Sequence, residues 1–147
     1  MMRCQFVMVL HCTIIIGQEM MLKILLVEDN LSFRGSLKSA LLNRIADLEI
    51  KEAADDKSTM VIVEAYLPDL IIMDINLNCA ISGLDLTKLI TTMYSEIAVV
   101  ILSHHDIPEY RSVAMENGAH SFFSKSSPLE NIIDYVDSVA LSECGLH

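Results

Sequence analysis

Two apolar segments, LKILLV at residues 22–27 and LIIM at residues 70–73, both end at acidic residues. Glu28 and Asp29 follow the first segment, and Asp74 follows the second. Short, branched and almost unbroken apolar runs are typical of strands that are buried on both faces of a parallel sheet. Ligands bind to such sheets just beyond the carboxyl ends of the strands. We therefore expect a site where these two segments end.

The three carboxylates would share one small volume if the two strands are neighbours. Two unit charges about 4 Å apart repel by roughly 4 kcal/mol at an effective dielectric of 20. Such a cluster requires a compensating positive charge, and carboxylate oxygens are the ligands that hard divalent cations prefer. The residues therefore predict a Mg²⁺ site that keeps coordination positions open for water or for a phosphoryl group.

The composition narrows the class of protein. A chain of 147 residues fits one domain with a sizeable core. Its formal net charge of -10 argues against direct binding of nucleic acid, which requires a basic face. The four cysteines have neither the spacing of a zinc site nor the density of a secreted disulfide scaffold. We therefore expect a reduced, cytoplasmic protein.

Residues 1–20 differ from the rest of the chain. They contain four of the nine methionines, and a fifth, Met21, follows directly. The apolar stretch at residues 6–16 is too short for a transmembrane helix, which takes about 20 residues. It also lacks the cleavage site of a secretory signal. We expect residues 1–20 to be a non-native apolar extension, residues 21–143 to form the domain, and no contact with a membrane.

From Met21 onward, strand-like and helix-like segments alternate with short connections, which indicates an α/β fold with a parallel sheet. Strands are expected at about residues 23–27, 48–53, 70–74, 98–102 and 121–124. Helices are expected over an apolar stripe at positions 33, 37, 41 and 45, over 58–66, 84–94 and 108–117, and from Pro128. In the helix at 84–94 we expect Leu86, Leu89, Ile90 and Met93 to face inward.

Four motifs occur in an order and spacing that are specific when taken together: LLVEDN, LIIMDIN, VVILS and GAHSFFSK. With them, the chain resembles the receiver domain of two-component response regulators from Met21 to about Leu141. The resemblance implies a flavodoxin-like (βα)5 fold, with a doubly wound, five-stranded parallel sheet in the order 2-1-3-4-5. It also implies a signalling switch rather than a turnover enzyme, with activity limited to its own phosphorylation and slow dephosphorylation.

The resemblance implies that Asp74 accepts a phosphoryl group from a phosphohistidine of a sensor histidine kinase. Asp29, Asp74 and the backbone carbonyl of Asn76 would ligate Mg²⁺, and Glu28 would act mainly through a bound water. Lys125 follows the fifth expected strand, so its ammonium would lie at the same edge of the sheet as these carboxylates. Phosphoryl transfer requires positive charge at the equatorial oxygens, which the metal and the Lys125 ammonium would supply.

A conformational switch is also implied by the resemblance. Ser103 would bind a phosphoryl oxygen and move inward, and Phe122 would take the place of the family's aromatic switch residue. Because Phe122 has no hydroxyl, its switch would rest on burial of the ring. The responding surface would be the fourth helix, fifth strand and fifth helix, where similar proteins bind partners or form homodimers.

The chain departs from the family at two places. The loop after Asp74 has Asn78 where a proline is usual and reaches Gly83 one residue later, so we expect a longer, less rigid loop. The residue after Ser103 is normally small but is His104 here. We expect its imidazole to restrict access, giving slow loading by acetyl phosphate and a long-lived phosphorylated form.

Other functions fit the residues less well. A phosphohydrolase with an aspartyl nucleophile usually carries a second Asp two residues later, where this chain has Asn76. An unphosphorylated interaction module would not need both Asp74 and Lys125. A dinucleotide site would require a glycine-rich turn after the first strand. The remaining alternative is that this receiver is the front half of a longer, truncated transcriptional regulator.

Overall fold

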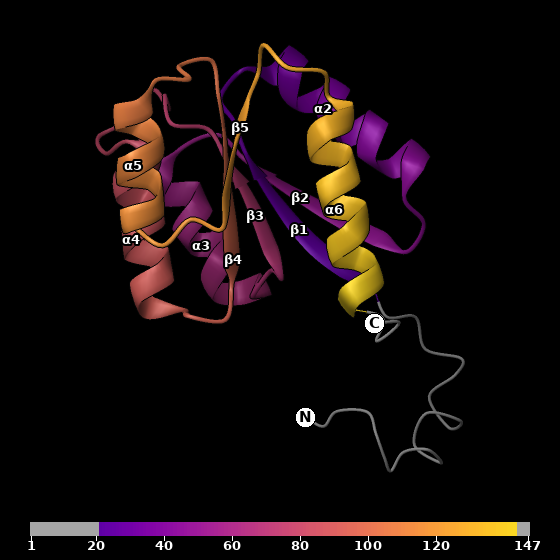
Figure 1. Ribbon diagram of the computed structural model, residues 1–147. Coiled ribbons are helices and arrows are strands. Elements are labelled where there is room, and N and C mark those ends of the chain that lie inside the picture. The colour runs from indigo at the N-terminus through magenta and orange to yellow at the C-terminus, as the bar shows by residue number, and fades with distance from the viewer. Residues whose placement is uncertain (1–20, 144–147) are drawn as a thin grey trace.

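The computed structural model describes residues 21–143, and the extension predicted at residues 1–20 lies outside this range. One five-stranded parallel sheet with the order β2-β1-β3-β4-β5 runs through the molecule (Figure 1). Its strands are β1 (Leu22–Val27), β2 (Leu48–Ala53), β3 (Leu70–Met73), β4 (Ala98–Ser103) and β5 (Ser121–Ser124). The predicted fold class and strand order are confirmed.

Helices cover both faces of the sheet (Figure 1). They are α2 (Leu31–Arg44), α3 (Asp56–Tyr66), α4 (Gly83–Met93), α5 (Pro108–Glu116) and α6 (Glu130–Glu143). α2 and α6 lie on one face, and α3, α4 and α5 lie on the other. A separate apolar core lies beneath each layer of helices, with Leu41 and Ile132 fully buried in one core and Leu86 and Ile90 in the other.

The register of β1 and β3 brings the acidic segments together. Val27 pairs with Met73 at the carboxyl ends of the two strands. The Asp74 backbone N–H then donates to the Val27 carbonyl at 3.0 Å. Glu28 and Asp74 therefore leave the sheet side by side, because parallel pairing places both carboxyl ends at the same edge.

The prediction for the buried face of α4 was wrong in part. Leu86 and Ile90 are fully buried, but Leu89 is 41% exposed and Met93 is 55% exposed. The buried face turns instead toward Thr87, whose hydroxyl donates to the Gly83 carbonyl at 2.7 Å. A hydroxyl that bonds back within its own helix costs little to bury, so the apolar spacing alone gave the wrong orientation.

Within residues 21–143, the structure has no helix that combines the length and the apolar character needed to cross a membrane.

Candidate functional site

The site lies at the carboxyl edge of the sheet, where β1 and β3 end. Oxygens of Glu28, Asp29 and Asp74 lie within 4.8 Å of one another. Glu28 and Asp74 are buried, with exposed fractions of 5% and 6%, whereas Asp29 is exposed. The structure therefore brings the three predicted carboxylates into one cluster that is buried on one side and exposed to solvent on the other.

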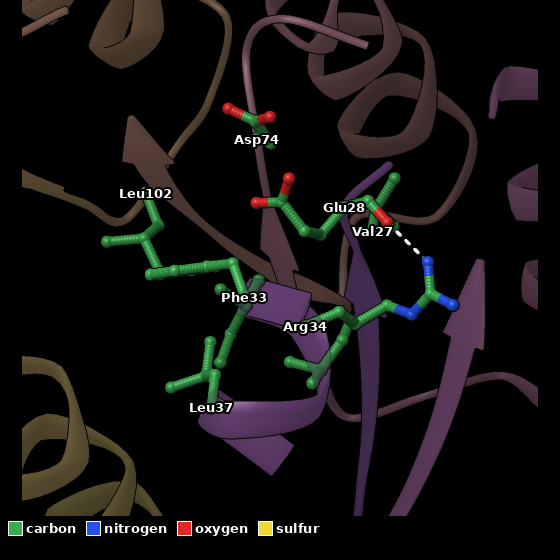
Figure 2. Close-up of a pocket in the computed structure, with 9 residues that line it drawn as sticks. Val27, Glu28, Phe33, Arg34, Leu37, Asp74 and Leu102 are labelled. Atoms are coloured by element: carbon green, nitrogen blue, oxygen red, sulfur yellow. Dashed lines mark hydrogen bonds between the residues drawn. The ribbon is translucent and has the colours of Figure 1, made fainter. Parts of the chain in front are cut away.

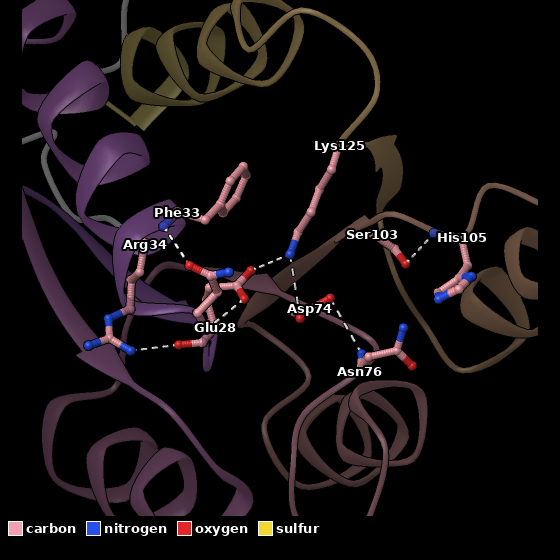
Figure 3. A network of polar contacts seen from close by, with 9 residues as sticks. Glu28, Phe33, Arg34, Asp74, Asn76, Ser103, His105 and Lys125 are labelled. Carbon is pink, nitrogen blue, oxygen red and sulfur yellow. Dashed lines mark hydrogen bonds and ion pairs between the residues drawn. The ribbon is translucent and has the colours of Figure 1, made fainter.

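Lys125 reaches this cluster from β5, across the full width of β4 (Figure 3). Its backbone N–H donates to the Ser103 carbonyl at 2.8 Å, which fixes the start of the side chain. The ammonium nitrogen lies 2.5 Å from Glu28 Oε1 and 3.5 Å from Asp74 Oδ2. The Lys125 side chain is only 4% exposed, so its charge acts on these carboxylates with little screening by water.

The charge state of Asp74 reflects its surroundings. Burial, followed by repulsion from Glu28, raises the pKa of Asp74 to about 6, although Lys125 and the Asn76 N–H act in the opposite direction. One ammonium shared between two buried carboxylates leaves the cluster short of positive charge. An added cation would favour the ionised form of Asp74.

Arg34 supports the acidic turn from α2, and the sequence analysis did not identify it. Its guanidinium donates from Nη1 to the Glu28 carbonyl at 2.6 Å (Figure 2) and pairs through Nε with Glu52 on β2 at 2.7 Å. The Glu28 carboxylate also accepts from the Asn30 N–H at 3.0 Å. The sequence does place Phe33 and Arg34 about one turn after the acidic residues. Which groups these two side chains contact, however, depends on the angle at which α2 packs on the sheet.

The loop after Asp74 is tied back to the end of β3. The Asn76 N–H lies 3.4 Å from Asp74 Oδ1, and the Gly83 N–H donates to the Ile75 carbonyl at 2.8 Å. A Cβ on Gly83 would lie 1.9 Å from the Asp74 carbonyl oxygen. Gly83 is therefore required for the close approach of α4 to the end of β3.

Beside this loop, the surface is hollowed over a volume of about 600 Å³. Asp29, Asn76 and Asn78 are among the residues that line the hollow. Asp29, the exposed member of the carboxylate cluster, therefore borders an open hollow of the surface.

The predicted switch residues lie on β4 and β5. Ser103 is fully buried, and its hydroxyl accepts from the His105 N–H at 3.0 Å. Phe122 is buried, and the Arg111 guanidinium carbon lies 4.7 Å from its ring centroid. His104 is exposed. In this structure the Phe122 ring is buried, and the Ser103 hydroxyl oxygen accepts a hydrogen bond from the backbone of the following loop.

A doubly wound sheet with clustered carboxylates and a buried lysine at its carboxyl edge defines a class of α/β signalling domain. The model of the family described as "Response regulator receiver domain" matches residues 24–137. The chain belongs to this family, and it is a receiver domain of two-component response regulators that acts as a signalling switch.

Curated relatives agree with this assignment. The chain is 27% identical over 129 residues to the transcriptional regulatory protein DegU of Brevibacillus brevis, covering 88% of this chain and 54% of the relative. It is 31% identical over 119 residues to the oxygen regulatory protein NreC of Staphylococcus carnosus, covering 80% and 54%. The chain thus spans about half the length of these relatives.

The fold is also similar to that of a solved receiver domain protein, described as CheY-like, from Methanospirillum hungatei JF-1. The TM-score is 0.76 at 16% identity, over 86% of this chain and 99% of the other. This likeness supports the fold.

Proposed function

We propose that Asp74 is the phosphoacceptor and that the donor is a phosphohistidine on a sensor histidine kinase. A carboxylate oxygen of Asp74 attacks the phosphorus, the P–N bond breaks, and the imidazole leaves with its electron pair and takes up a proton. The product is an aspartyl acyl phosphate. The observation that carries this proposal is the buried Lys125 ammonium 3.5 Å from Asp74 Oδ2. At that position it would neutralise charge on an equatorial phosphoryl oxygen.

The same cluster fits Mg²⁺. Its donors are carboxylate oxygens within 4.8 Å of one another, on a surface that opens to solvent at Asp29. Asp29, Asp74 and the Asn76 carbonyl would hold the ion, with Glu28 acting through water. When bound, the ion supplies positive charge that the cluster lacks and that transferring phosphoryl oxygens require.

Ser103 and Phe122 would couple the acceptor to a distant surface. The Ser103 hydroxyl would leave the His105 N–H and donate to a phosphoryl oxygen, a charge-assisted bond that exists in only one state. The α5–β5–α6 face would then change its affinity for a partner or a second copy. We place the protein in the cytoplasm and assign residues 21–143 as the receiver unit, with no direct contact to nucleic acid.

Phosphotransfer tests this function. A purified histidine kinase would be labelled with radioactive phosphate and mixed with the full chain in the presence of Mg²⁺ or of a chelator. We expect label on the wild type only with Mg²⁺, and none on Asp74→Asn. Asp85→Asn is the matched control, because Asp85 is exposed beside the same hollow. Equal labelling of wild type and Asp74→Asn would contradict the assignment.

A further inference from the structure

The Lys125 ammonium has a third neighbour besides its two carboxylates. The nitrogen lies 4.5 Å from the ring centroid of Phe33, and Figure 3 shows the ring beside the lysine side chain. An ammonium carries three N–H donors. One is donated to Glu28, Asp74 lies 3.5 Å away as an ion-pair partner, and the side chain is only 4% exposed. The π face of Phe33 is therefore a third partner of this buried charge.

The position of the Phe33 ring is fixed from its own backbone. The Phe33 N–H donates to Asn30 Oδ1 at 2.9 Å, which is the N-cap bond of α2. The first turn of α2 thus carries the ring to the edge of the carboxylate cluster. On its inner side the ring lines a cavity of about 10 Å³, together with Glu28, Asp74 and Leu102 (Figure 2). This volume corresponds to roughly one water molecule.

We propose that Phe33 is a positioning residue that holds the Lys125 ammonium against Asp74 through a cation–π contact. The inference rests on the proposed role of Asp74 and extends it to a residue that touches neither the acceptor nor the metal ligands through a polar bond. An aromatic face attracts an ammonium electrostatically, most strongly where water is excluded. Leucine would fill similar space but would offer the ammonium no negative face.

The competing explanation is that Phe33 only fills space in the core. The two explanations differ in how they respond to ring electronics. Fluorine atoms on the ring weaken its negative face while they change its shape little, so they weaken a cation–π contact and spare simple packing. Mono-, di- and trifluorophenylalanine would be introduced at position 33 alone. Phe123, whose ring packs edge-on against Tyr135 at 5.5 Å between centroids, is the matched control position.

Two measurements use this series. The first is the rate of phosphorylation by a small phosphodonor with Mg²⁺, which we expect to fall stepwise, reaching about a tenfold loss for the trifluoro ring and for Phe33→Leu. The series at Phe123 should leave the rate unchanged. A rate within about twofold of the wild type for both Phe33→Leu and the trifluoro ring would overturn the proposal.

The second measurement does not depend on phosphorylation. The Lys125 side-chain methylene protons next to the ammonium should show an upfield ring-current shift in NMR spectra, which disappears in Phe33→Leu. Fluorination at position 33 should also lower the thermal unfolding temperature of the wild type but not of Lys125→Met. If Asp74 takes up no phosphoryl group, the proposed function fails, and these two results still decide whether the ring holds the ammonium. An unshifted Lys125 signal would refute the contact.

Discussion

At Asp74, burial and a neighbouring carboxylate oppose the ionised form, and one lysine compensates them only in part. Glu28 is the nearer partner of Lys125, at 2.5 Å against 3.5 Å for Asp74. Asp74 is therefore the carboxylate that gains most from a metal ion. This unequal sharing supports the proposed role of Asp74 as an acceptor that reacts when Mg²⁺ is bound.

The raised pKa of Asp74 has a consequence for stability in the absence of metal. The folded protein retains the Asp74 proton up to about pH 6, whereas the unfolded chain releases it near the ordinary value of 3.8. The folded state thus binds more protons between these values, and stability falls as pH rises from about 4 to about 6. Asp74→Asn removes this loss.

We expect Asp74→Asn to raise the free energy of unfolding by on the order of 1–3 kcal/mol at pH 7.5 with a chelator present. The gain should shrink toward zero near pH 4. Urea denaturation of both proteins across this pH range is the measurement. A gain that is equally large at pH 4, or absent at pH 7.5, would argue against a destabilising charge at position 74.

His104 follows the buried Ser103 and is itself exposed. An imidazole at this position would limit the approach of acetyl phosphate and of hydrolytic water. We expect His104→Ala to speed both loading and hydrolysis by about threefold or more, roughly 0.7 kcal/mol in each barrier. His120→Ala, at an exposed site before β5, should change neither rate. Rates that are unchanged in His104→Ala would remove His104 as a barrier.

The placement of single residues was predictable to different degrees. The convergence of Asp74 and Lys125 was predictable, because the carboxyl ends of parallel strands lie at one edge of the sheet. The contacts of Phe33 and Arg34 were not, since both side chains leave the first turn of α2 toward groups on other elements. Their direction depends on the packing of that helix against the sheet.

At the scale of elements, the approach of α4 to β3 sets the position of Asp74. Gly83→Ala would place a Cβ 1.9 Å from the Asp74 carbonyl oxygen, a backbone atom that cannot move alone. We expect a loss of about 1–3 kcal/mol or more in unfolding free energy and weaker Mg²⁺ binding. Calorimetry would measure the free energy of unfolding. Magnesium binding would be followed by tyrosine fluorescence, since the chain has no tryptophan.

Gly35 provides the matched control, because a Cβ there meets nothing within 4 Å. It lies inside α2, so Gly35→Ala should stabilise the protein by about 0.5–1 kcal/mol and leave Mg²⁺ binding unchanged. If Gly83→Ala behaved like Gly35→Ala, the acceptor loop would have more freedom than the close contact implies.

The sequence predicted which helices and strands occur, but it did not correctly predict which face of α4 is buried. Every strand and helix was expected near its observed position, because apolar period and turn residues mark elements well. The inward face of α4 was misjudged because Thr87 takes a buried place beside Leu86 and Ile90. Apolar spacing does not reveal a threonine that bonds to its own helix.

At the scale of the whole molecule, one topological fact creates the site. The order β2-β1-β3-β4-β5 sets β1 beside β3 and leaves β5 at an edge, from which Lys125 extends across β4. The alternation of segments predicted a parallel sheet, while the strand order came from the resemblance to receiver domains. Residues 21–143 thus form a scaffold with the carboxylate cluster at its carboxyl edge, and we propose the α5–β5–α6 face as the surface that responds.

Phosphorylation should therefore change association. With Mg²⁺ and beryllium fluoride as the phosphoryl analogue, we expect the chain to form dimers in sedimentation velocity experiments. Val113→Glu, on the exposed side of α5, should weaken the dimer by at least about tenfold. Val61→Glu, at an exposed site on α3, should not. A protein that stays monomeric with the analogue bound would rule out the dimer face.

The most direct test of the account identifies the atom that receives the phosphoryl group. The phosphorylated chain would be reduced with borohydride, which converts an aspartyl phosphate into homoserine, and then sequenced by mass spectrometry. We expect homoserine at position 74 in samples loaded with Mg²⁺, and none at any position in samples loaded with a chelator. Homoserine at position 29, or a phosphoryl group that survives on a histidine or serine, would contradict the assignment of Asp74.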